Sequence, residues 1–358
     1  MTATPMQQER TGASRRRTMV DNGHGTFTAR AHGALLIDEW TRFGDRIETL
    51  VGPRRAPGQN WLAVVARWCA VRHQTDSGNQ SELRQEALQQ RSGGMAEIDV
   101  TSVPNAARVY DYFLGGTHNH EVDRQAAEYM SALVPSTRRW VRKLRRFLHV
   151  ATAELREENF VRFLDLASGL PTEDHIHSTV PAAQVVYVDN DPLVFASGSE
   201  LLGDNPRTRY LQADIRDIEA ILRSAPVVEL LDGGQKVGIG FNAITCFLAD
   251  DEIRRIVHAL YDWAPPGSKI FGTFETKAAG AMTPKMQQFV DMFERLGSPY
   301  HFLTPERSRA LMHPWVEDER GLLPLSEWLS LDEPVAAEDR EGVGLEFYGA
   351  ILVKPTSA

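Results

Sequence analysis

The sequence predicts an α/β protein in which a mostly parallel sheet is covered by helices on both faces. From about residue 161 onward, short apolar runs alternate with segments of helical length, a pattern typical of parallel sheets built from strand–helix–strand units. A late apolar and aromatic run at 344–353 suits a final antiparallel strand. The chain has 358 residues, enough to bury a large core and to carry an extension.

The expected strands follow from these apolar runs. They lie at 161–166, 184–189, 208–212, 237–244, 268–274 and 346–353, with another within 317–325, and helices separate most of them. Three further helices are expected before the first strand, at 103–114, 123–133 and 137–158. The double glycine Gly115-Gly116 is expected to end the first of these.

The third of these helices carries a basic run from Arg138 to Arg146. Apolar residues recur within it at helical spacing, namely Trp140, Val141, Leu144, Phe147 and Leu148. We therefore interpret the charges as the solvated face of a packed helix, not as a nucleic-acid site.

The N-terminal part of the chain has a different composition. Residues 1–26 are polar and predict a disordered tail, 27–75 a helical extension with helices at 33–51 and 60–72, and 76–97 a linker. Each of these two helices presents bulky groups, Trp40 with Phe43 and Trp61 with Trp68, which a lone hairpin cannot bury. They are expected to pack either against a second copy, giving a homodimer, or against the main domain of the same chain.

Composition excludes several other classes of protein. No apolar run approaches the roughly 20 residues of a membrane span, and no signal peptide is recognisable, so we expect a cytoplasmic protein without membrane contact. The net charge of −9 argues against general nucleic-acid binding. Neither Cys69 nor Cys246 has a paired spacing, and no disulfide framework is expected. The pairs His118/His120 and His175/His177 could chelate a metal, but we expect no metal site.

Acidic side chains stand at the ends of three successive strands. Asp165 opens a turn of small residues, Asp189 ends the next strand, and Asp214 follows the third. A turn of this kind lets backbone N–H groups approach a ligand. The second acid can accept both hydroxyls of a ribose, and the third can accept from an adenine amino group. Together these features meet the needs of S-adenosylmethionine (SAM), which carries no phosphate.

The chain also resembles a known family over residues 98–355. The matching residues include Val103, Pro104, Ala107, Arg108, Val109, Tyr110, Asp111, Tyr112, Phe113, Leu114, Gly115, Gly116, Asn119, Asp123, Arg124, Asp165, Gly169, Leu170, Pro171, Thr172, His177, Asp189, Asn190, Asp191, Pro192, Asp214, Pro266, Gly267 and Trp328. They resemble the signatures of an actinobacterial SAM-dependent methyltransferase family, formerly a domain of unknown function. The resemblance implies a Rossmann-like, seven-stranded fold in a domain at 98–358, with an N-terminal helical cap at 98–158.

The resemblance also implies site residues by position. Asp165, Ala167, Ser168 and Gly169 would wrap the methionine part of SAM, Asp189 with Asn190 would bind the ribose, and Asp214 with Ile215 would bind the adenine. The remaining cofactor-binding positions that we assign are Arg108, Gly115, Gly116 and Thr245. The alternative for Asp165 and Asp214 is a structural role as turn or helix-capping acids.

Some positions depart from the family pattern. Ala167 replaces the first glycine of the turn, and a Cβ there is expected to displace the methionine part or change the turn. His118 and His120 follow the double glycine, where the family usually has Asp and an aromatic residue. Because an imidazole titrates near neutral pH, these two histidines are candidate general bases, together with Tyr110.

Three functions remain open from the sequence. The first is SAM-dependent methylation of a small-molecule nucleophile, with a secondary metabolite as the expected class. The second is a SAM-assisted reaction without methylation, namely cyclisation, rearrangement or elimination, suggested by the altered turn. The third is a non-catalytic regulatory SAM-binding protein, suggested by the N-terminal extension.

Overall fold

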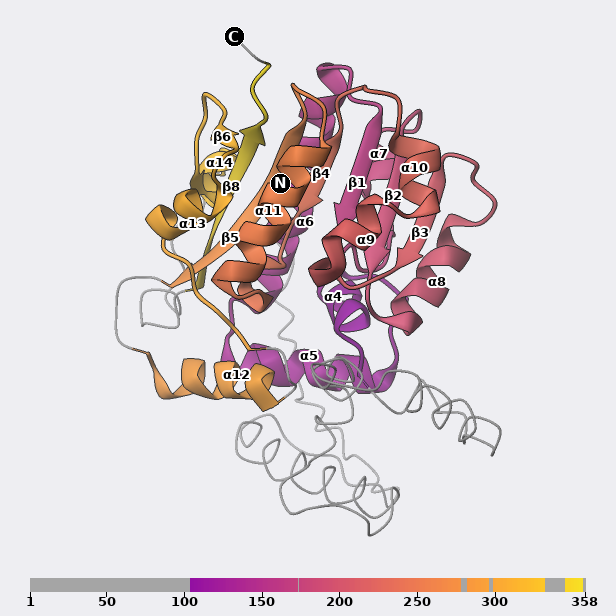
Figure 1. Ribbon diagram of the computed structural model, residues 1–358. Coiled ribbons are helices and arrows are strands. Elements are labelled where there is room, and N and C mark those ends of the chain that lie inside the picture. The colour runs from indigo at the N-terminus through magenta and orange to yellow at the C-terminus, as the bar shows by residue number, and fades with distance from the viewer. Residues whose placement is uncertain (1–103, 173, 278–281, 296–298, 332–344, 357–358) are drawn as a thin grey trace, which may run out of the picture. The chain divides into compact units, whose positions relative to one another are not determined.

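The computed structural model describes residues 104–172, 174–277, 282–295, 299–331 and 345–356 (Figure 1). The tail, helical extension and linker expected within 1–97, and the interface proposed for them, lie outside the described residues. The sheet consists of β1 (Arg162–Leu166), β2 (Gln184–Asp189), β3 (Thr208–Gln212), β4 (Gly238–Phe241), β5 (Lys269–Lys277), β6 (Val316–Glu317), β7 (Leu323–Pro324) and β8 (Leu345–Val353).

The strand order is β3-β2-β1-β4-β5-β8-β6, and β7 pairs with β8 beside this path. Strands β1 to β5 run parallel to one another, and β8 runs antiparallel to its neighbour β5. This arrangement confirms the expected topology. The sheet of the described chain has eight strands where seven were expected, because the segment after residue 315 forms two short strands of two residues each. Strand β5 also continues to Lys277, three residues beyond its expected end.

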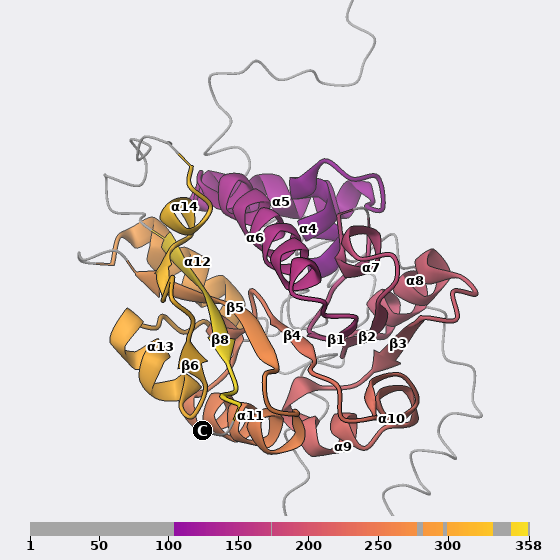
Figure 2. The same cartoon turned by 90° about the horizontal axis from the view of Figure 1, so that it is seen from above.

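Helices cover both faces of the sheet. They are α4 (Ala106–Leu114), α5 (Glu121–Leu133), α6 (Thr137–Glu157), α7 (Ile176–Thr179), α8 (Pro192–Leu202), α9 (Ile218–Leu222), α10 (Ala225–Leu231), α11 (Asp250–Trp263), α12 (Pro284–Arg295), α13 (Pro305–Met312) and α14 (Leu325–Trp328), with 3₁₀ turns η1 (Ile215–Asp217) and η2 (Thr245–Phe247). Figure 2 shows α6 and α7 on one face of the sheet and α9, α10 and α11 on the other.

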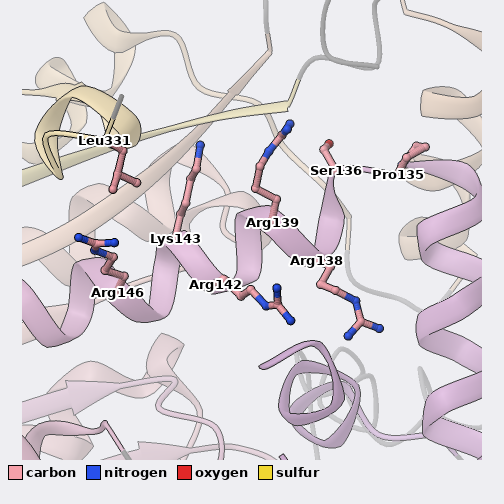
Figure 3. Close-up of a pocket in the computed structure, with 8 residues that line it drawn as sticks. All are labelled: Pro135, Ser136, Arg138, Arg139, Arg142, Lys143, Arg146 and Leu331. Atoms are coloured by element: carbon pink, nitrogen blue, oxygen red, sulfur yellow. The ribbon is translucent and has the colours of Figure 1, made fainter. Parts of the chain in front are cut away.

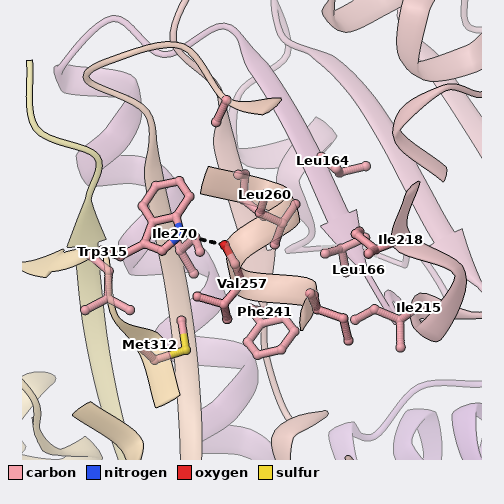
Figure 4. Packing of buried hydrophobic residues seen from close by; sticks show 14 of the residues in the cluster. Leu164, Leu166, Ile215, Ile218, Phe241, Val257, Leu260, Ile270, Met312 and Trp315 are labelled. Carbon is pink, nitrogen blue, oxygen red and sulfur yellow. Dashed lines mark hydrogen bonds between the residues drawn. The ribbon is translucent and has the colours of Figure 1, made fainter. Parts of the chain in front are cut away.

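The alternation of side chains along each strand divides the core into two layers. On β1, Leu164 and Leu166 point toward the layer covered by α9 to α11, whereas Phe163 packs in the layer beneath α6. In the first layer, the indole Nε1 of Trp315 donates a hydrogen bond of 3.1 Å to the carbonyl of Val257 (Figure 4). Asp165 follows Phe163 by two residues and therefore faces the α6 side. Polar groups of the strand ends thus face the N-terminal helices.

Helix α6 buries the apolar stripe that its sequence predicts. Trp140, Val141, Leu144, Phe147 and Leu148 are all buried, which confirms that the basic run belongs to a packed helix. Helices α4 and α5 precede it, and Figure 1 shows them with α12 across the carboxyl end of the sheet.

A hydrogen bond ties the start of α4 to the sheet. The side chain of Asn105 accepts from the backbone nitrogens of Ala107 and Arg108, which caps α4. Its amide nitrogen donates to the carboxylate of Asp191 over 2.7 Å, and Asp191 itself caps α8 just beyond β2. The cap of α4 therefore depends on the turn that follows β2.

A buried carboxylate joins α4 to α5. Asp123 is fully buried and accepts from the backbone nitrogens of Asn105 and His120 over 2.8 Å each. The Nε of Arg108 donates to the same carboxylate over 2.7 Å. Both ions are taken out of water, so each depends on its partner for compensation.

We predict that Asp123→Ala destabilises the fold by about 3–5 kcal/mol, because it removes the carboxylate that pairs with the buried Arg108 guanidinium and that accepts from two backbone N–H groups. Glu121→Ala is the matched control, since its ion pair with Arg124 is exposed and contributes less than about 1 kcal/mol. Urea denaturation followed by circular dichroism measures both. Equal midpoints for the two variants would contradict the assignment.

Candidate active site

The turn after β1 accommodates the residues that depart from the family pattern. Ala167 adopts the left-handed conformation, with a φ of 57°, and Gly169 follows with a φ of 63°. A left-handed non-glycine residue costs about 1 kcal/mol or more, and Ser168 supplies hydrogen bonds that offset it. Its backbone nitrogen donates to Val188 O, and its hydroxyl accepts from Val188 N, each over 2.9 Å. The turn therefore adopts the conformation that a glycine would favour, and Ser168 ties it to β2.

Asp165 is buried beneath this turn. Its Oδ2 has no hydrogen-bond partner and lies 3.7 Å from Nε2 of His175. The His175 Nδ1 accepts from the backbone nitrogen of Ile176, so Nε2 carries the proton of the neutral ring and faces Asp165 and the Ser168 carbonyl. Burial lowers the pKa of His175 well below its usual value, which keeps the ring uncharged.

The electrostatics of Asp165 combine burial with a nearby cation. Burial raises the pKa of its carboxyl to about 7, and the positive charge of Arg145 on α6 opposes this rise. Nη1 of Arg145 is buried and has no hydrogen-bond partner, and its guanidinium lies 5.7 Å from the centre of the Tyr110 ring. A carboxylate and a guanidinium thus share one buried region, each with an atom available to a ligand.

Asp189 stands at the end of β2. Its carboxylate accepts from the backbone nitrogens of Gly169 and Asp191, over 3.0 Å each. Burial raises its pKa to about 6, and these two N–H donors lower it. Each oxygen retains a lone pair for another donor. The adjacent Asn190 is exposed.

Asp214 stands at the end of β3 as the N-cap of η1. Its side chain accepts from the backbone nitrogen of Arg216 over 2.9 Å, so it has the capping role that the sequence left open. Ile215 is buried in the core next to it. The carboxyl ends of β1, β2 and β3 are adjacent in the parallel sheet, which brings Asp165, Asp189 and Asp214 to one edge.

The ends of β4 and β5 add polar groups that sequence reasoning did not select. Both amide atoms of Asn242, directly after β4, are buried without a partner. Glu275 on β5 is 1% exposed, and its Oε1 also lacks a partner. The hydroxyl of Tyr300 donates to the other oxygen, Oε2. Burial raises the pKa of Glu275 to about 8, and Tyr300 opposes the rise.

The candidate bases lie on the N-terminal helices. The hydroxyl of Tyr110 donates to Val141 O over 3.3 Å, and burial raises its pKa, which disfavours the phenolate. His118 is exposed, with Nδ1 at 3.9 Å from Asp111. His120 is the N-cap of α5, and its backbone nitrogen donates to Asp123. These contacts anchor the loop between α4 and α5.

The remaining assigned residues support the frame of the site. Arg108 pairs with Asp123, and Thr245 donates to Thr273 O over 3.2 Å from a fully buried position. Gly115 ends α4 with a φ of 89°, and Gly116 lies against Asp111. Ala107, in contrast, lies at the other end of α4. A Cβ added to Gly169 would lie 3.8 Å from the Cβ of Ala107. The start of α4 therefore contacts the turn after β1.

An open pocket of about 420 Å³ lies elsewhere, along α6 (Figure 3). Its lining residues are Pro135, Ser136, Arg138, Arg139, Arg142, Lys143, Arg146 and Leu331. None of the strand-end acids takes part in it. We therefore centre the site on the strand ends.

Comparison with known proteins identifies the family. A family model described as S-adenosyl methyltransferase matches residues 92–355. The chain belongs to this family. It is accordingly a SAM-dependent methyltransferase with SAM as its cofactor, as the strand-end acids predicted. No curated protein matches the chain.

Two crystal structures resemble this methyltransferase over most of their length. A proposed methyltransferase from Thermobifida fusca is 31% identical with a TM-score of 0.62, and the match covers 72% of this chain and 97% of that one. A DUF574 family protein from Streptomyces avermitilis is 28% identical with a TM-score of 0.61, and the match covers 71% of this chain and 99% of that one. No helix among the described residues of this methyltransferase is long and apolar enough to cross a membrane.

Sequence reasoning missed Arg145, Asn242, Glu275 and Tyr300. A signal existed for two of them. Arg145 stands four residues after Val141 and three before Leu148, on the apolar stripe of α6. Glu275 lies on the same face of β5 as Phe271 and Thr273. This position marks it as an inward-facing acid once β5 is extended to Lys277.

The raised pKa of Glu275 predicts a stability that falls as pH rises. The carboxyl ionises near 4.5 in the unfolded chain and at about 8 in the fold, so between these values only the unfolded chain has lost the proton. Raising the pH in this window therefore favours unfolding, by about 1.4 kcal/mol per pH unit. Glu275→Gln removes this contribution, and urea denaturation across the window should show a shallower fall for the variant. An identical pH dependence in both proteins would refute the shift.

Proposed function

We propose that this methyltransferase transfers the methyl group of SAM to a small-molecule nucleophile at the carboxyl ends of β1, β2, β4 and β5. The observation that carries the proposal is the gathering of unpartnered buried atoms at this edge: Arg145 Nη1, Asp165 Oδ2, both amide atoms of Asn242, and Glu275 Oε1. An unpaired buried polar group costs about 1–3 kcal/mol, so a cluster of them is consistent with a site shaped for a polar ligand.

The residues of this edge fit the polar groups of SAM. Asp165 Oδ2 would accept from the α-ammonium group of the methionine part, and Arg145 Nη1 would donate to its carboxylate. Asp189 would accept from the ribose hydroxyls while still holding Gly169 and Asp191. Asp214 would accept from the adenine amino group. When bound, SAM supplies a methyl group made electrophilic by its sulfonium.

The chain's own contribution is to hold and enclose the reactants. Helices α4, α5 and α12 lie across the strand ends, and α12 packs against α5. Such a cover excludes water and aligns a nucleophile with the methyl group, and positioning of this kind accounts for much of the rate of a transfer reaction. A covered, partly apolar edge favours a small acceptor over a macromolecule.

We predict that Asp189→Ala weakens SAM binding at least about 100-fold, since charge-assisted hydrogen bonds contribute about 1.5–3 kcal/mol each. Adenosine binding should weaken with it, because the ribose is common to both ligands. Isothermal calorimetry measures both affinities, and Asp204→Ala, an exposed acid after α8, is the control. A folded Asp189→Ala protein with wild-type affinity would exclude the ribose assignment.

Arg145→Ala should separate the two ligands. We predict that it weakens SAM binding by about 10-fold to 100-fold through loss of the contact to the methionine carboxylate, while adenosine binding stays unchanged. Arg146→Ala is the matched control, because Arg146 is the exposed neighbour on the same helix. If Arg145→Ala weakened adenosine and SAM equally, Arg145 would act on the fold of the site and not on the methionine part.

A further inference from the structure

Glu275 is the buried acid of this edge that the cofactor assignment does not use. It lies on β5 with Oε1 unpartnered, while its Oε2 accepts from Tyr300. The backbone on each side is fixed, since the nitrogen of Leu303 donates to Glu275 O over 2.8 Å and the nitrogen of His301 donates to Cys246 O over 2.7 Å. The Cys246 thiol is buried beside the same carboxyl, and burial raises its pKa well above the usual value. The thiol therefore stays neutral and adds no negative charge beside the acid.

Aromatic rings surround Tyr300, the residue that hydrogen-bonds this carboxyl. Tyr300 lies 4.9 Å from Phe293, 5.4 Å from Phe247 and 5.4 Å from Phe289, measured between ring centroids. Phe302 adds a further ring at 5.4 Å from Tyr300. Among the residues that the structure describes, the contacts of Glu275 and of these rings include no lysine or arginine. The hydrogen-bond partner of this buried carboxyl thus belongs to an aromatic cluster and carries no positive charge.

The sheet places this carboxyl next to the cofactor side of the edge. Thr273 and Glu275 lie on the same face of β5, two residues apart, which corresponds to roughly 7 Å along the strand. The hydroxyl of Thr273 accepts from the backbone nitrogen of Ala243 over 2.8 Å, directly after the unpartnered Asn242. On β4, a Cβ at Gly240 would meet both Asp165 and the ring of Phe271. The α6-facing side of β1, β4 and β5 thus carries Asp165, Asn242 and Glu275 as one row.

We propose that Glu275, with Tyr300 and the rings of Phe247 and Phe293, forms the acceptor subsite and that the acceptor is an amine. The proposal rests on the proposed function, because it names the substrate class of the same site. A protonated amine would satisfy Oε1 with a charge-assisted hydrogen bond, and the ring faces would attract its positive charge. An alcohol would satisfy the hydrogen bond without bringing a positive charge with which an ionised Glu275 could pair. A carboxylic acid acceptor would be repelled as its anion.

The same pairing gives Glu275 a chemical role. The ammonium form of the substrate transfers one proton to the Glu275 carboxylate, which leaves a neutral amine with a free lone pair. This nitrogen forms a bond to the methyl carbon as the carbon–sulfur bond of SAM breaks, and the electron pair of that bond stays on sulfur. The product is a methylated ammonium ion and S-adenosylhomocysteine, and Glu275 later releases its proton to solvent. Asn242 would orient the amine through its unpartnered amide.

The test is calorimetry on the full-length protein saturated with S-adenosylhomocysteine, with phenethylamine and its neutral isostere 2-phenylethanol as probes. At neutral pH the free Glu275 is mostly protonated, because burial raises its pKa to about 8. Binding of the ammonium ion should therefore release close to one proton, which is measured by repeating the titration in buffers of different ionisation enthalpy. We expect phenethylamine to bind at least about 10-fold more tightly than 2-phenylethanol.

Glu275→Gln should remove both the preference for the amine and the proton release, while SAM affinity stays at the wild-type value. Glu294→Gln, at an exposed position on α12, is the matched control and should keep both properties. Equal affinity for the two probes, no binding of phenethylamine at millimolar concentration, or amine binding without proton release would overturn the proposal. Loss of SAM binding in the wild-type protein would instead reject the proposed function, so the two failures are distinguishable.

Discussion

The carboxyl group of Asp165, buried at the end of β1, constrains more of this site than any other group. Gly240 has no side chain because a Cβ there would lie 2.0 Å from Oδ1 of Asp165. The neutral ring of His175 faces this carboxyl, and the hydroxyl of Ser168 donates to the backbone carbonyl of Asp165. Arg145 opposes the effect of burial on its pKa. Each of these features meets the need of one buried acid for space, hydrogen bonds or positive charge.

The N-terminal helices share this dependence through separate contacts. Asn105 hydrogen-bonds Asp191 after β2, and Ala107 lies next to Gly169 in the turn after β1. Asp123 then joins Arg108 on α4 to the start of α5. The helices therefore cannot leave the strand ends without breaking the charge-assisted hydrogen bond between Asn105 and Asp191. The helices that cover the site therefore contact the same turns, after β1 and β2, that would hold the cofactor.

The edge of the sheet divides into two electrostatic environments. Around β1 and β2, acids lie among backbone N–H donors and a guanidinium, which suits a zwitterionic and hydroxyl-rich ligand. Around β5, the acid accepts from Tyr300, whose ring packs against other aromatic rings. In both environments burial raises the pKa of the carboxyl. Burial thus raises the pKa of the acids at β1 and β2 and of the acid on β5 for the same reason, which is the loss of solvation of the charged form.

The sequence by itself determined the strand order along the chain, the three acids that end β1, β2 and β3, and the family. These features are local, because periodicity and turn chemistry are written in neighbouring residues. It did not determine which acids remain unpartnered, nor that Asp214 caps η1 while Ala167 adopts the left-handed conformation. The position of Arg145 on the apolar stripe of α6 could be seen in the sequence, but its interaction with Asp165 depends on the packing of α6 against the sheet. Glu275 and Tyr300 are 25 residues apart, and their hydrogen bond exists only because the fold brings them together. Burial and electrostatic pairing are properties of tertiary contacts, and these decided the candidate acceptor subsite.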